Sequence, residues 1–409
     1  MSLREDANKI MKAALAAAMP DAAVHAALEK AEFSSGKLVL IAAGKAGWQM
    51  AKAAYDQLGE RIDHGVVVTK YDHSKGPIGN LEIYEAGHPV PDANSFRATQ
   101  AAIDAVTGLS ANDTVLFLLS GGGSALFEKP LIPDTDLDRL TKQLLACGAD
   151  IVEMNTVRKR FSAVKGGRFA QLCQPAKVFT IVLSDVLGDR LDMIASGPAY
   201  PDASTAADAY RIARKYNLTL TDQMEQLIMA ETPKELENVQ THITGSVRQL
   251  CIAAEKACRE LGYETVTLTD RLSCTARDAG VFLSNIAGLY AGSGKKMAFL
   301  AGGETVVHLT GHGLGGRNQE LALAAAPGIS GLNAAVFSLG SDGTDGPTDA
   351  AGGYVDGTTM LNLKSQGIHI SDVLQNNDAY HALQRCDGLI ITGATGTNVN
   401  DISVLLIGG

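Results

Sequence analysis

The sequence lacks the cysteine spacing of a zinc site or a disulfide scaffold. Its six cysteines are scattered over 409 residues, and none of them forms a C-x-x-C pair. Reduced and mostly buried thiols in a cytoplasmic protein are the simpler interpretation. The cysteines therefore argue against two common kinds of site and predict a cytoplasmic location.

The sequence also lacks a long apolar run and an excess of positive charge. The apolar part of residues 1–30 is too short and too interrupted for a signal peptide or a membrane span, and it fits an amphipathic helix. The formal net charge is -10 and the pI is near 5.4, which argues against a nucleic-acid or membrane-surface partner. A small anionic ligand remains compatible, because local lysines and backbone amides decide its binding.

Two common nucleotide-binding signatures are missing as well. No G-x-x-x-x-G-K-[ST] loop occurs, and the similar stretch GSGKK at 292–296 precedes a predicted strand instead of following one. The stretch GHGLGG at 311–316 has the glycine spacing of a dinucleotide fingerprint, but its flanking residues match poorly. The sequence therefore argues against a P-loop and gives only weak support to a dinucleotide site.

The length and composition indicate a two-domain globular protein. A chain of 409 residues exceeds what one core usually organises, and 46% hydrophobic with 20% charged residues is ordinary for globular proteins. The composition changes at 232–244, TPKELENVQTHIT, which predicts a boundary there. We therefore expect one domain over residues 1–238 and a second over residues 239–409.

Short apolar runs that end in small-residue turns alternate with helical patterns. One such strand is predicted at about 38–43, and helices are predicted at Trp48–Leu58, Leu137–Cys147, Val247–Leu261 and Arg277–Leu289. This alternation predicts an α/β fold with parallel βαβ units. Ligands of such sheets bind beyond the carboxyl ends of the strands, where the unusual residues of this chain lie. The pattern therefore predicts one large active cleft.

A glycine-rich turn after the strand TVLFLL has the composition of an anion-binding loop. Glycine lets the backbone approach a ligand closely, and amides that lead into a helix attract anions. We interpret the turn as a cradle for phosphate or carboxylate; a tight connection that packs a helix onto the sheet is the alternative. Its residues are Ser120, Gly121, Gly122, Gly123 and Ser124.

Several cations stand near such turns. Lys45 follows a strand between Gly44 and Gly47, where it can reach an anion; a solvated surface lysine is the alternative. Arg317 stands between glycines and a helical pattern, with Asn318 as a candidate N-cap, and can grip phosphate or carboxylate with two hydrogen bonds. Arg158 and Lys165 lie in a helix-like segment that could also be a solvated basic face.

Acidic side chains follow other predicted strands. Clustered carboxylates near a phosphate cradle suit Mg²⁺, whereas a single aspartate more often caps a helix or closes an Asx turn. The loop SDGTDG at 341–346 is the strongest candidate, because two acids and Thr344 share it. His88 and His312 show no metal spacing, and structural hydrogen bonding is the favoured interpretation for both. The candidate acids are Asp185, Asp189, Glu304, Asp342 and Asp345.

Ten stretches, in order along the chain, resemble one known family. They are AAGKAGWQMA, GHPVPD, LLSGGGSALFE, NTVRKRFSAVKGGR, LSDVLGD, IASGP, GGETVV, GLGGRNQELAL, SDGTDGPTDAAGG and TGATGTNVND. From about Asp6 to Leu406 the sequence is similar to the class II, MOFRL-type glycerate kinases. The clear departure is TARDAG at 275–280, where members of the family more often carry Gly-Glu before Ala-Arg.

The resemblance implies ATP-dependent phosphorylation of D-glycerate, giving 2-phosphoglycerate and ADP. It also implies two Rossmann-like α/β domains, with mostly parallel sheets flanked by helices and the active site in the cleft between the domains. By motif match, the family's lysine falls on Lys45 and its cleft arginine on Arg317. The sequence leaves the oligomeric state open between a monomer and a homo-oligomer.

Kinase chemistry suggests a role for each group, because phosphoryl transfer depends on positioning and charge neutralisation. We expect Arg317 to hold the glycerate carboxylate, Lys45 to stabilise the transferred phosphoryl group or orient the attacking hydroxyl, and the turn 120–124 to bind ATP phosphates. Asp189 is the predicted base. The predicted magnesium ligands are Asp185, Asp342 and Asp345. The other predicted substrate or nucleotide contacts are Gly44, Asn155, Arg158, Lys165, Glu304, Thr344 and Asn398.

Two other functions are compatible with parts of the pattern. A hydroxypyruvate reductase would act on the same three-carbon acid skeleton, but the poor dinucleotide fingerprint argues against it. A non-catalytic sensor of sugar acids would need the anion cradles but neither Lys45 nor the acids. The kinase interpretation uses all of these residues.

Overall fold

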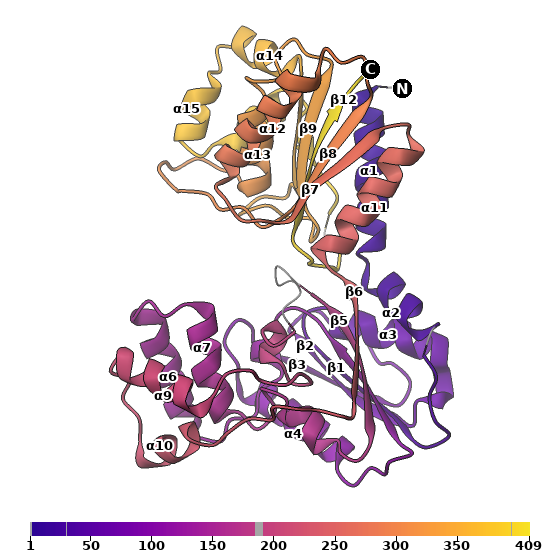
Figure 1. Cartoon of the computed structure of the whole chain (residues 1–409), viewed down its shortest axis with the longest axis vertical. Coiled ribbons are helices and arrows are strands. Elements are labelled where there is room, and N and C mark those ends of the chain that lie inside the picture. Colours follow the sequence, from indigo (N-terminus) through magenta and orange to yellow (C-terminus); the bar gives the residue numbers. More distant parts are fainter. Residues whose placement is uncertain (1, 30, 185–190, 394) are drawn as a thin grey trace. The chain divides into compact units, whose positions relative to one another are not determined.

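The chain folds into two compact units, each built around its own sheet (Figure 1). The computed structural model describes residues 2–29, 31–184, 191–393 and 395–409. The N-terminal unit takes the described residues between Ala23 and Thr244, and the C-terminal unit joins the segment up to Ala22 to Gly245–Gly409. No helix among the described residues has the length and apolar character needed to cross a membrane.

The N-terminal unit has a sheet in the strand order β3-β2-β1-β4-β5-β6. The four pairings among β1 to β5 are parallel, and this order is that of dinucleotide-binding Rossmann folds. The strands are β1 (Leu38–Ala43), β2 (His64–Lys70), β3 (Leu81–Ala86), β4 (Thr114–Leu119), β5 (Lys177–Leu183) and β6 (Val239–Gly245).

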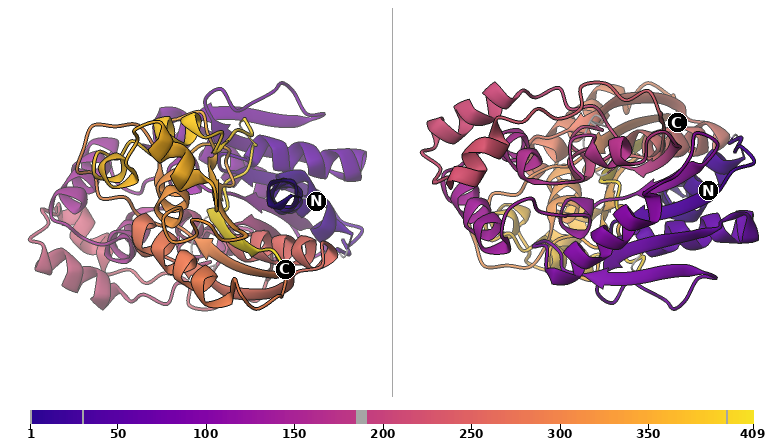
Figure 2. Two further views of the ribbon diagram at one scale, coloured as in Figure 1. Left: turned by 90° about the horizontal axis from the view of Figure 1, so that it is seen from above. Right: turned by 90° about the horizontal axis from the view of Figure 1, so that it is seen from below.

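Helices cover both faces of this sheet (Figure 2), so β1 and β4 are buried along their whole length. One face packs Leu38 and Leu40 against α2 and α3, and the rings of Phe117, Phe127 and Phe169 cluster on the other. The helices are α2 (Pro20–Leu28), α3 (Gly47–Leu58), α4 (Ala93–Val106), α5 (Gly123–Leu126), α6 (Asp134–Ala146), α7 (Ile151–Arg158), α8 (Arg168–Leu172), α9 (Ala206–Lys215) and α10 (Asp222–Ile228), with 3-10 turns at Gly59–Arg61, Lys159–Phe161 and Ile194–Ser196.

The C-terminal unit has a mixed sheet in the order β11-β10-β9-β12-β8-β7. Only β7 and β8 pair in parallel; the pairs of β12 with β8 and β9, and of β10 with β9 and β11, are antiparallel. Four strands therefore run one way, while β10 and β12 run the other. The strands are β7 (Glu264–Leu272), β8 (Met297–Gly303), β9 (Ala334–Gly340), β10 (Gly352–Asp356), β11 (Leu389–Ile390) and β12 (Asp401–Ile407).

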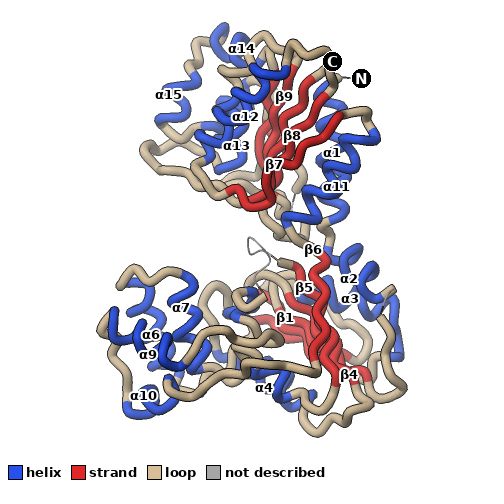
Figure 3. Tube along the Cα trace, viewed as in Figure 1, coloured by secondary structure: helices blue, strands red, loops and turns tan. Residues whose placement is uncertain are grey.

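Alternate residues of these strands feed two apolar layers, as strand geometry requires. Helices α1 and α11 cover one face of the sheet and α12 and α13 the other (Figure 3). Leu300, Phe337 and Val404 pack in the first layer, and Phe299 and Val336 in the second. The helices are α1 (Leu3–Ala17), α11 (Val247–Glu260), α12 (Ala276–Tyr290), α13 (Arg317–Ala325), α14 (Thr359–Ser365), α15 (Ile370–Gln375) and α16 (Ala379–Arg385).

Most of the sequence-based expectations for the fold are confirmed. The α/β class and the flanking helices are present, and the predicted strand at 38–43 and all four predicted helices match the structure within three residues at each end. The expectation of parallel pairing is wrong for the C-terminal sheet, because β10 and β12 return through loops and not through a crossover helix. The compact units also differ from the predicted ranges 1–238 and 239–409, since α1 packs on the C-terminal sheet.

Candidate functional site

The turns after β1 and β4 interlock at the carboxyl edge of the N-terminal sheet. The amide of Lys45 donates to the carbonyl of Gly121 at 2.8 Å, and the amide of Ala46 donates to Oγ of Ser120 at 3.1 Å. Gly44 has φ +127°, and a Cβ there would lie 2.2 Å from Oγ of Ser120. These are the adjacent strands at which the chain reverses its order, where Rossmann-type sheets bind ligands.

The β4 turn presents backbone donors. Within the described residues, the amides of Gly121, Gly122 and Ser124 have no hydrogen-bond acceptor, and Gly122 adopts φ +83°. Three unpaired N–H groups in one turn can bind an anion, as the sequence predicts. Ser120 and Gly44 contribute differently: Oγ of Ser120 is engaged by the amide of Ala46, and Gly44 allows the close approach of the two turns.

The ammonium of Lys45 lies beside this turn. Among the described residues, no hydrogen bond or ion pair engages its Nζ, and the side chain is half-buried. Its Cγ lies 3.1 Å from the position that a Cβ of Gly122 would occupy. A cation without a protein partner next to unpaired amides is suited to an anionic ligand.

Lys165, a predicted ligand contact, is instead fully buried beneath the turn. Its ammonium donates to the carbonyls of Ser124 and Phe127 at 2.7 and 3.3 Å and lies 3.3 Å from Glu128. An ammonium has three N–H donors, and these three partners use all of them. Burial lowers the pKa of Lys165, and the carboxylate of Glu128 opposes this shift. The structure therefore places Lys165 as a support of the turn.

A second support connects Ser124 to Asn155 through a residue that sequence reasoning missed. Oγ of Ser196 lies 3.2 Å from Oγ of Ser124 and donates to Oδ1 of Asn155 at 3.1 Å. Ala195 and Ser196 adopt φ +49° and +63°, a strained conformation for residues other than glycine, which is concentrated at functional sites. Asn155 is itself buried, so its amide acts on the turn and not on solvent.

Arg158 is the other predicted cation of this unit. Its Nε is buried without a hydrogen-bond partner among the described residues, although the residue as a whole is half-buried. The positive charge of Arg158 also contributes to lowering the pKa of Lys165. The guanidinium donor without a described partner keeps Arg158 as a candidate anion contact.

The candidate residues of the C-terminal unit gather around Arg317, the first residue of α13. Its Nε and Nη2 donate to the carboxylate of Asp401 at 2.5 and 2.9 Å, and its Nη1 lies 3.4 Å from the exposed Glu304. Asp401 begins β12, opposite Gly303 of β8 and Gly340 of β9. Because β12 runs against both strands, its first residue lies at the edge where they end. Burial raises the pKa of Asp401, and the Arg317 guanidinium opposes this shift.

The two acids of the loop SDGTDG cap a helix and close an Asx turn, which are the alternative roles that the sequence offered for single aspartates. Asp345 accepts the amides of Asn318 and Gln319 at 3.1 and 2.8 Å, so it caps α13 from a distant loop. The predicted N-cap at Asn318 is therefore wrong; Gly316 holds that position. Burial raises the pKa of Asp345 to about 6 despite these two hydrogen bonds. Asp342 accepts the amide of the exposed Thr344 at 3.0 Å in an Asx turn.

The remaining predicted contacts occupy the neighbouring loop or lie outside the described part. Asn398 is half-buried, and its Oδ1 accepts the amide of Asn400 at 3.4 Å. The loop that carries it packs on Ser341, whose Oγ accepts the amide of Val399 at 2.8 Å. Asp185 and Asp189 lie outside the described residues.

The described residues offer few side chains that could bind a magnesium ion. Among these residues, no group of three or more His, Cys, Asp or Glu side chains could hold a metal. Asp345 is engaged by α13, whereas Asp342 offers a half-buried carboxylate. Mg²⁺ needs only one or two protein carboxylates when phosphates and water complete its shell. The arrangement fits an ion carried by a nucleotide and does not fit a protein cage.

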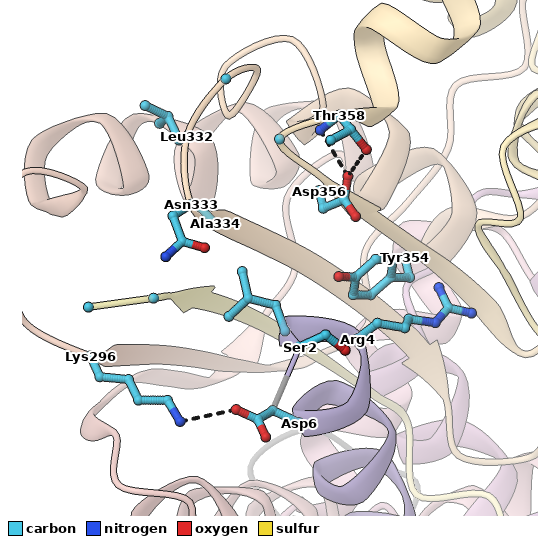
Figure 4. A pocket seen from close by; sticks show the side chains of 15 residues that line it. Ser2, Arg4, Asp6, Lys296, Leu332, Asn333, Ala334, Tyr354, Asp356 and Thr358 are labelled. Carbon is cyan, nitrogen blue, oxygen red and sulfur yellow. Dashed lines mark hydrogen bonds and ion pairs between the residues drawn. The ribbon is translucent and has the colours of Figure 1, made fainter.

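Two hollows lie away from the predicted residues. One of about 590 Å³ lies at the opposite edge of the C-terminal sheet, where Arg4 stacks on Tyr354 and Lys296 pairs with Asp6 (Figure 4). The other, of about 610 Å³, adjoins β3 and includes Tyr84. No predicted site residue lines either hollow, so the candidate site rests on the loop contacts described above.

Comparison with known proteins gives matches along almost the whole chain. Residues 6–229 match the family described as a domain of unknown function, DUF4147, and residues 297–401 match the MOFRL family. D-glycerate 2-kinase of Thermotoga maritima is 51% identical over 99% of both chains. A crystal structure of glycerate kinase from that organism superimposes with a TM-score of 0.96, covering 99% of each chain.

More distant relatives carry two kinds of name. Glycerate 2-kinase of Pyrococcus horikoshii is 39% identical over 100% of this chain and 98% of its own. A protein of Agrobacterium vitis with the provisional name hydroxypyruvate reductase is also 39% identical, over 100% of this chain and 95% of its own. The identities and coverage show that the chain belongs to the class II, MOFRL-type glycerate kinase family.

Proposed function

We propose that this chain is a kinase that transfers the γ-phosphoryl group of ATP to the 2-hydroxyl of D-glycerate, giving 2-phosphoglycerate and ADP. One observation carries the proposal: 51% identity to a D-glycerate 2-kinase over 99% of both chains. The interlocked β1 and β4 turns, with unpaired amides beside an unpaired ammonium, supply the anion chemistry that this reaction needs.

The proposed roles follow from which groups lack a hydrogen-bond partner among the described residues. Lys45 and the amides of Gly121, Gly122 and Ser124 bind phosphate oxygens and offset charge that builds up during transfer. Arg158 adds a further donor on the same unit. Lys165 and Asn155 position the turn from beneath and do not themselves contact a ligand.

Arg317 is proposed to hold the glycerate carboxylate. Its guanidinium is oriented by Asp401, and the N–H groups of Nη1 and Nη2 that neither Asp401 nor Glu304 engages remain for an anion. Glu304, Thr344 and Asn398 lie on loops at this edge and complete the proposed contact set. Asp401 is thus a positioning residue that acts through Arg317.

The reductase alternative lacks a structural basis in the sheet that has the Rossmann strand order. A dinucleotide-binding fold carries three glycines in the first βα turn and, about 20 residues on, an acid for the ribose. Here the turn has only Gly44 and Gly47, and β2 ends in Lys70, a cation. These residues favour phosphate binding over recognition of a ribose hydroxyl.

Three further assignments complete the proposal. Mg²⁺ enters with ATP, and Asp342 is its proposed protein contact, with Asp185 kept from the sequence as a second ligand; Asp189 is the sequence-based candidate for the base, for which the structure offers an alternative below. The chain acts in the cytoplasm, which suits its six free cysteines. It consists of an N-terminal glycerate kinase-type domain and a C-terminal MOFRL-type domain, and acts on no nucleic acid or membrane; its oligomeric state stays open between a monomer and a homo-oligomer.

A paired assay separates the two functions. ADP released from ATP and D-glycerate is followed in one reaction, and loss of NADH absorbance with hydroxypyruvate in a second. The proposal predicts ADP formation that depends on D-glycerate, together with unchanged NADH absorbance. NADH oxidation without any ADP formation would replace the kinase by the reductase.

A further inference from the structure

A histidine reaches the point where Lys45 and Gly122 meet. His88 stands in the loop between β3 and α4, and its Nε2 lies 3.2 Å from the position that a Cβ of Gly122 would occupy. Cγ of Lys45 lies 3.1 Å from the same position. Three turns, following β1, β3 and β4, therefore converge on one point at the carboxyl edge of the N-terminal sheet. A glycine is required there, because any side chain would fill this point.

No hydrogen bond to a described residue explains the position of the His88 imidazole. The side chain is half-buried, and within the described residues it has no hydrogen-bond partner. Sequence reasoning favoured structural hydrogen bonding for this residue, which the structure does not bear out. A half-buried ring with two unpaired nitrogens is available to a ligand.

Within the described part of the chain, the charged or titratable groups that act on the pKa of His88 are two lysines and a histidine. They are Lys45 from the β1 turn, Lys70 at the end of β2 and His73 in the following turn, whereas the β4 turn contributes no charge. Asp92, the acid at the end of the same loop, is engaged by Tyr71 and Ser95. Burial, and then the charges of Lys45 and Lys70, lower the pKa of His88. The ring is therefore neutral at neutral pH and keeps a lone pair that can accept a proton.

We propose that His88 is the group that accepts the hydroxyl proton of glycerate during phosphoryl transfer, an inference that rests on the proposed kinase function. The hydroxyl oxygen forms a bond to the γ-phosphorus, while the bond from that phosphorus to the β–γ bridging oxygen breaks. The electron pair of the broken bond leaves with ADP. The hydroxyl proton passes to a ring nitrogen of His88 and then to water. In this scheme His88 takes the place of Asp189 as the base.

The basicity of His88 is sufficient for this task. Protein kinases use an aspartate as the base, and an imidazole remains more basic than a carboxylate even when its pKa lies somewhat below the usual 6.5. Bound nucleotide phosphates also offset the charges of Lys45 and Lys70. The site therefore favours a neutral imidazole before ATP binds and makes proton uptake easier once the anion is in place.

The first test is the pH dependence of His88→Asn, since asparagine keeps hydrogen-bonding groups but does not titrate. We expect kcat at pH 7 to fall by about 10²-fold or more, the usual contribution of a general base. The ratio of wild-type to variant kcat/KM is expected to fall below pH 6.5, as His88 takes up a proton in the wild type. Titration of ATP itself affects both enzymes and cancels in this ratio.

Two controls keep the test decisive. His25→Asn changes a half-buried histidine of α2 whose Nδ1 lies 2.7 Å from Oε1 of Gln57 and which belongs to no candidate site, so the variant should retain wild-type kcat at every pH. Thermal unfolding of His88→Asn shows whether the variant folds; if it does not, His88→Gln is measured in its place. Wild-type kcat in the folded variant, or a reduced kcat with a ratio that does not change with pH, would overturn the inference.

A second measurement does not depend on turnover. The ring protons of His88, assigned by their loss in His88→Asn, are titrated by NMR with and without a non-hydrolysable ATP analogue. The inference predicts a His88 pKa below the ordinary histidine value of 6.5 in the free protein, and a rise when the analogue binds. A pKa unchanged by the analogue would contradict it. Absence of ADP formation by the wild type would overturn the proposed function, whereas full activity of His88→Asn would overturn this inference alone.

Discussion

Arg317 donates from Nε and Nη2 to both carboxylate oxygens of Asp401, at 2.5 and 2.9 Å. This pair joins the first residue of α13 to the first residue of β12, which are 84 residues apart in sequence. Two parallel hydrogen bonds fix the plane of the guanidinium, so its remaining edge faces a defined direction. Asp401 therefore determines how Arg317 can receive a substrate carboxylate.

Replacing Asp401 with Asn should weaken glycerate binding through Arg317. The variant keeps the shape of the side chain but removes its charge, and hydrogen bonds to charged groups are worth about 1.5–3 kcal/mol. We expect KM for D-glycerate to rise by about 10-fold or more at 1.4 kcal/mol per factor of ten, while KM for ATP stays near the wild-type value. Steady-state kinetics with each substrate varied in turn measures both constants.

Glu304→Gln is the matched control for this prediction. Glu304 also contacts Arg317, but at 3.4 Å and with an exposed side chain, so its contribution is expected to be below about 1 kcal/mol. The rise in KM for glycerate should therefore be clearly smaller than for Asp401→Asn. Equal effects of the two variants would show that Asp401 has no special role in orienting Arg317.

Replacing Gly122 with Ala should damage the phosphate cradle. The residue has φ +83°, and the new Cβ would lie 3.0 Å from Cδ2 of His88 and 3.1 Å from Cγ of Lys45. The left-handed backbone costs about 1–2 kcal/mol for any residue with a Cβ, and the contacts displace two candidate site residues as well. We expect lower thermal stability and a loss of kinase activity.

Gly148→Ala separates these two effects. Gly148 has φ +72°, and no atom lies within 4 Å of its added Cβ. Its replacement should cost a similar amount of stability but leave kcat unchanged. If both variants retained full activity, the point between His88 and Lys45 would have no role in turnover.

The raised pKa of Asp345 predicts how the stability of the protein changes with pH. Its pKa is raised from 3.8 to about 6 in the folded protein, mainly by burial. A raised pKa means that the folded state holds the proton more tightly than the unfolded state, so its stabilising effect is complete below pH 3.8 and is lost as pH rises through about 6. A shift of this size corresponds to at most about 3 kcal/mol.

The comparison with Asp345→Asn isolates this group. Urea unfolding at pH values from 4 to 7 gives the free energy of unfolding of both proteins, and other titrating groups contribute equally to each. The difference, wild type minus variant, should decrease as pH rises, on top of a constant offset for the weakened α13 cap. A difference that stays constant, or that increases with pH, would contradict the burial-raised pKa.

The sequence predicts those parts of the site that depend on local sequence patterns. Gly44 and Ser120–Ser124 follow apolar runs, and the rule that parallel strands end at one edge brings these turns together with Lys45. This juxtaposition in the N-terminal unit therefore needs no knowledge of side-chain packing.

Other features depend on long-range contacts that no local pattern reveals. The role of Asp401 requires β12 to enter the C-terminal sheet antiparallel between β8 and β9, after a loop without a helix. Asp345 was proposed as a metal ligand, but it caps a helix that begins almost thirty residues earlier in the chain. Lys165 resembled a ligand contact because its partners, Glu128 and two carbonyls, become neighbours only in the folded chain.

Phosphorus NMR of the reaction of ATP with D-glycerate, recorded for the wild type and for Lys45→Ala, tests the central claim most directly. The wild type should accumulate the signals of 2-phosphoglycerate and ADP. The variant, with its folding verified, should form them about 10²-fold more slowly or worse, because transition-state charge loses its cation. A 3-phosphoglycerate signal, or an undiminished rate in Lys45→Ala, would contradict the account.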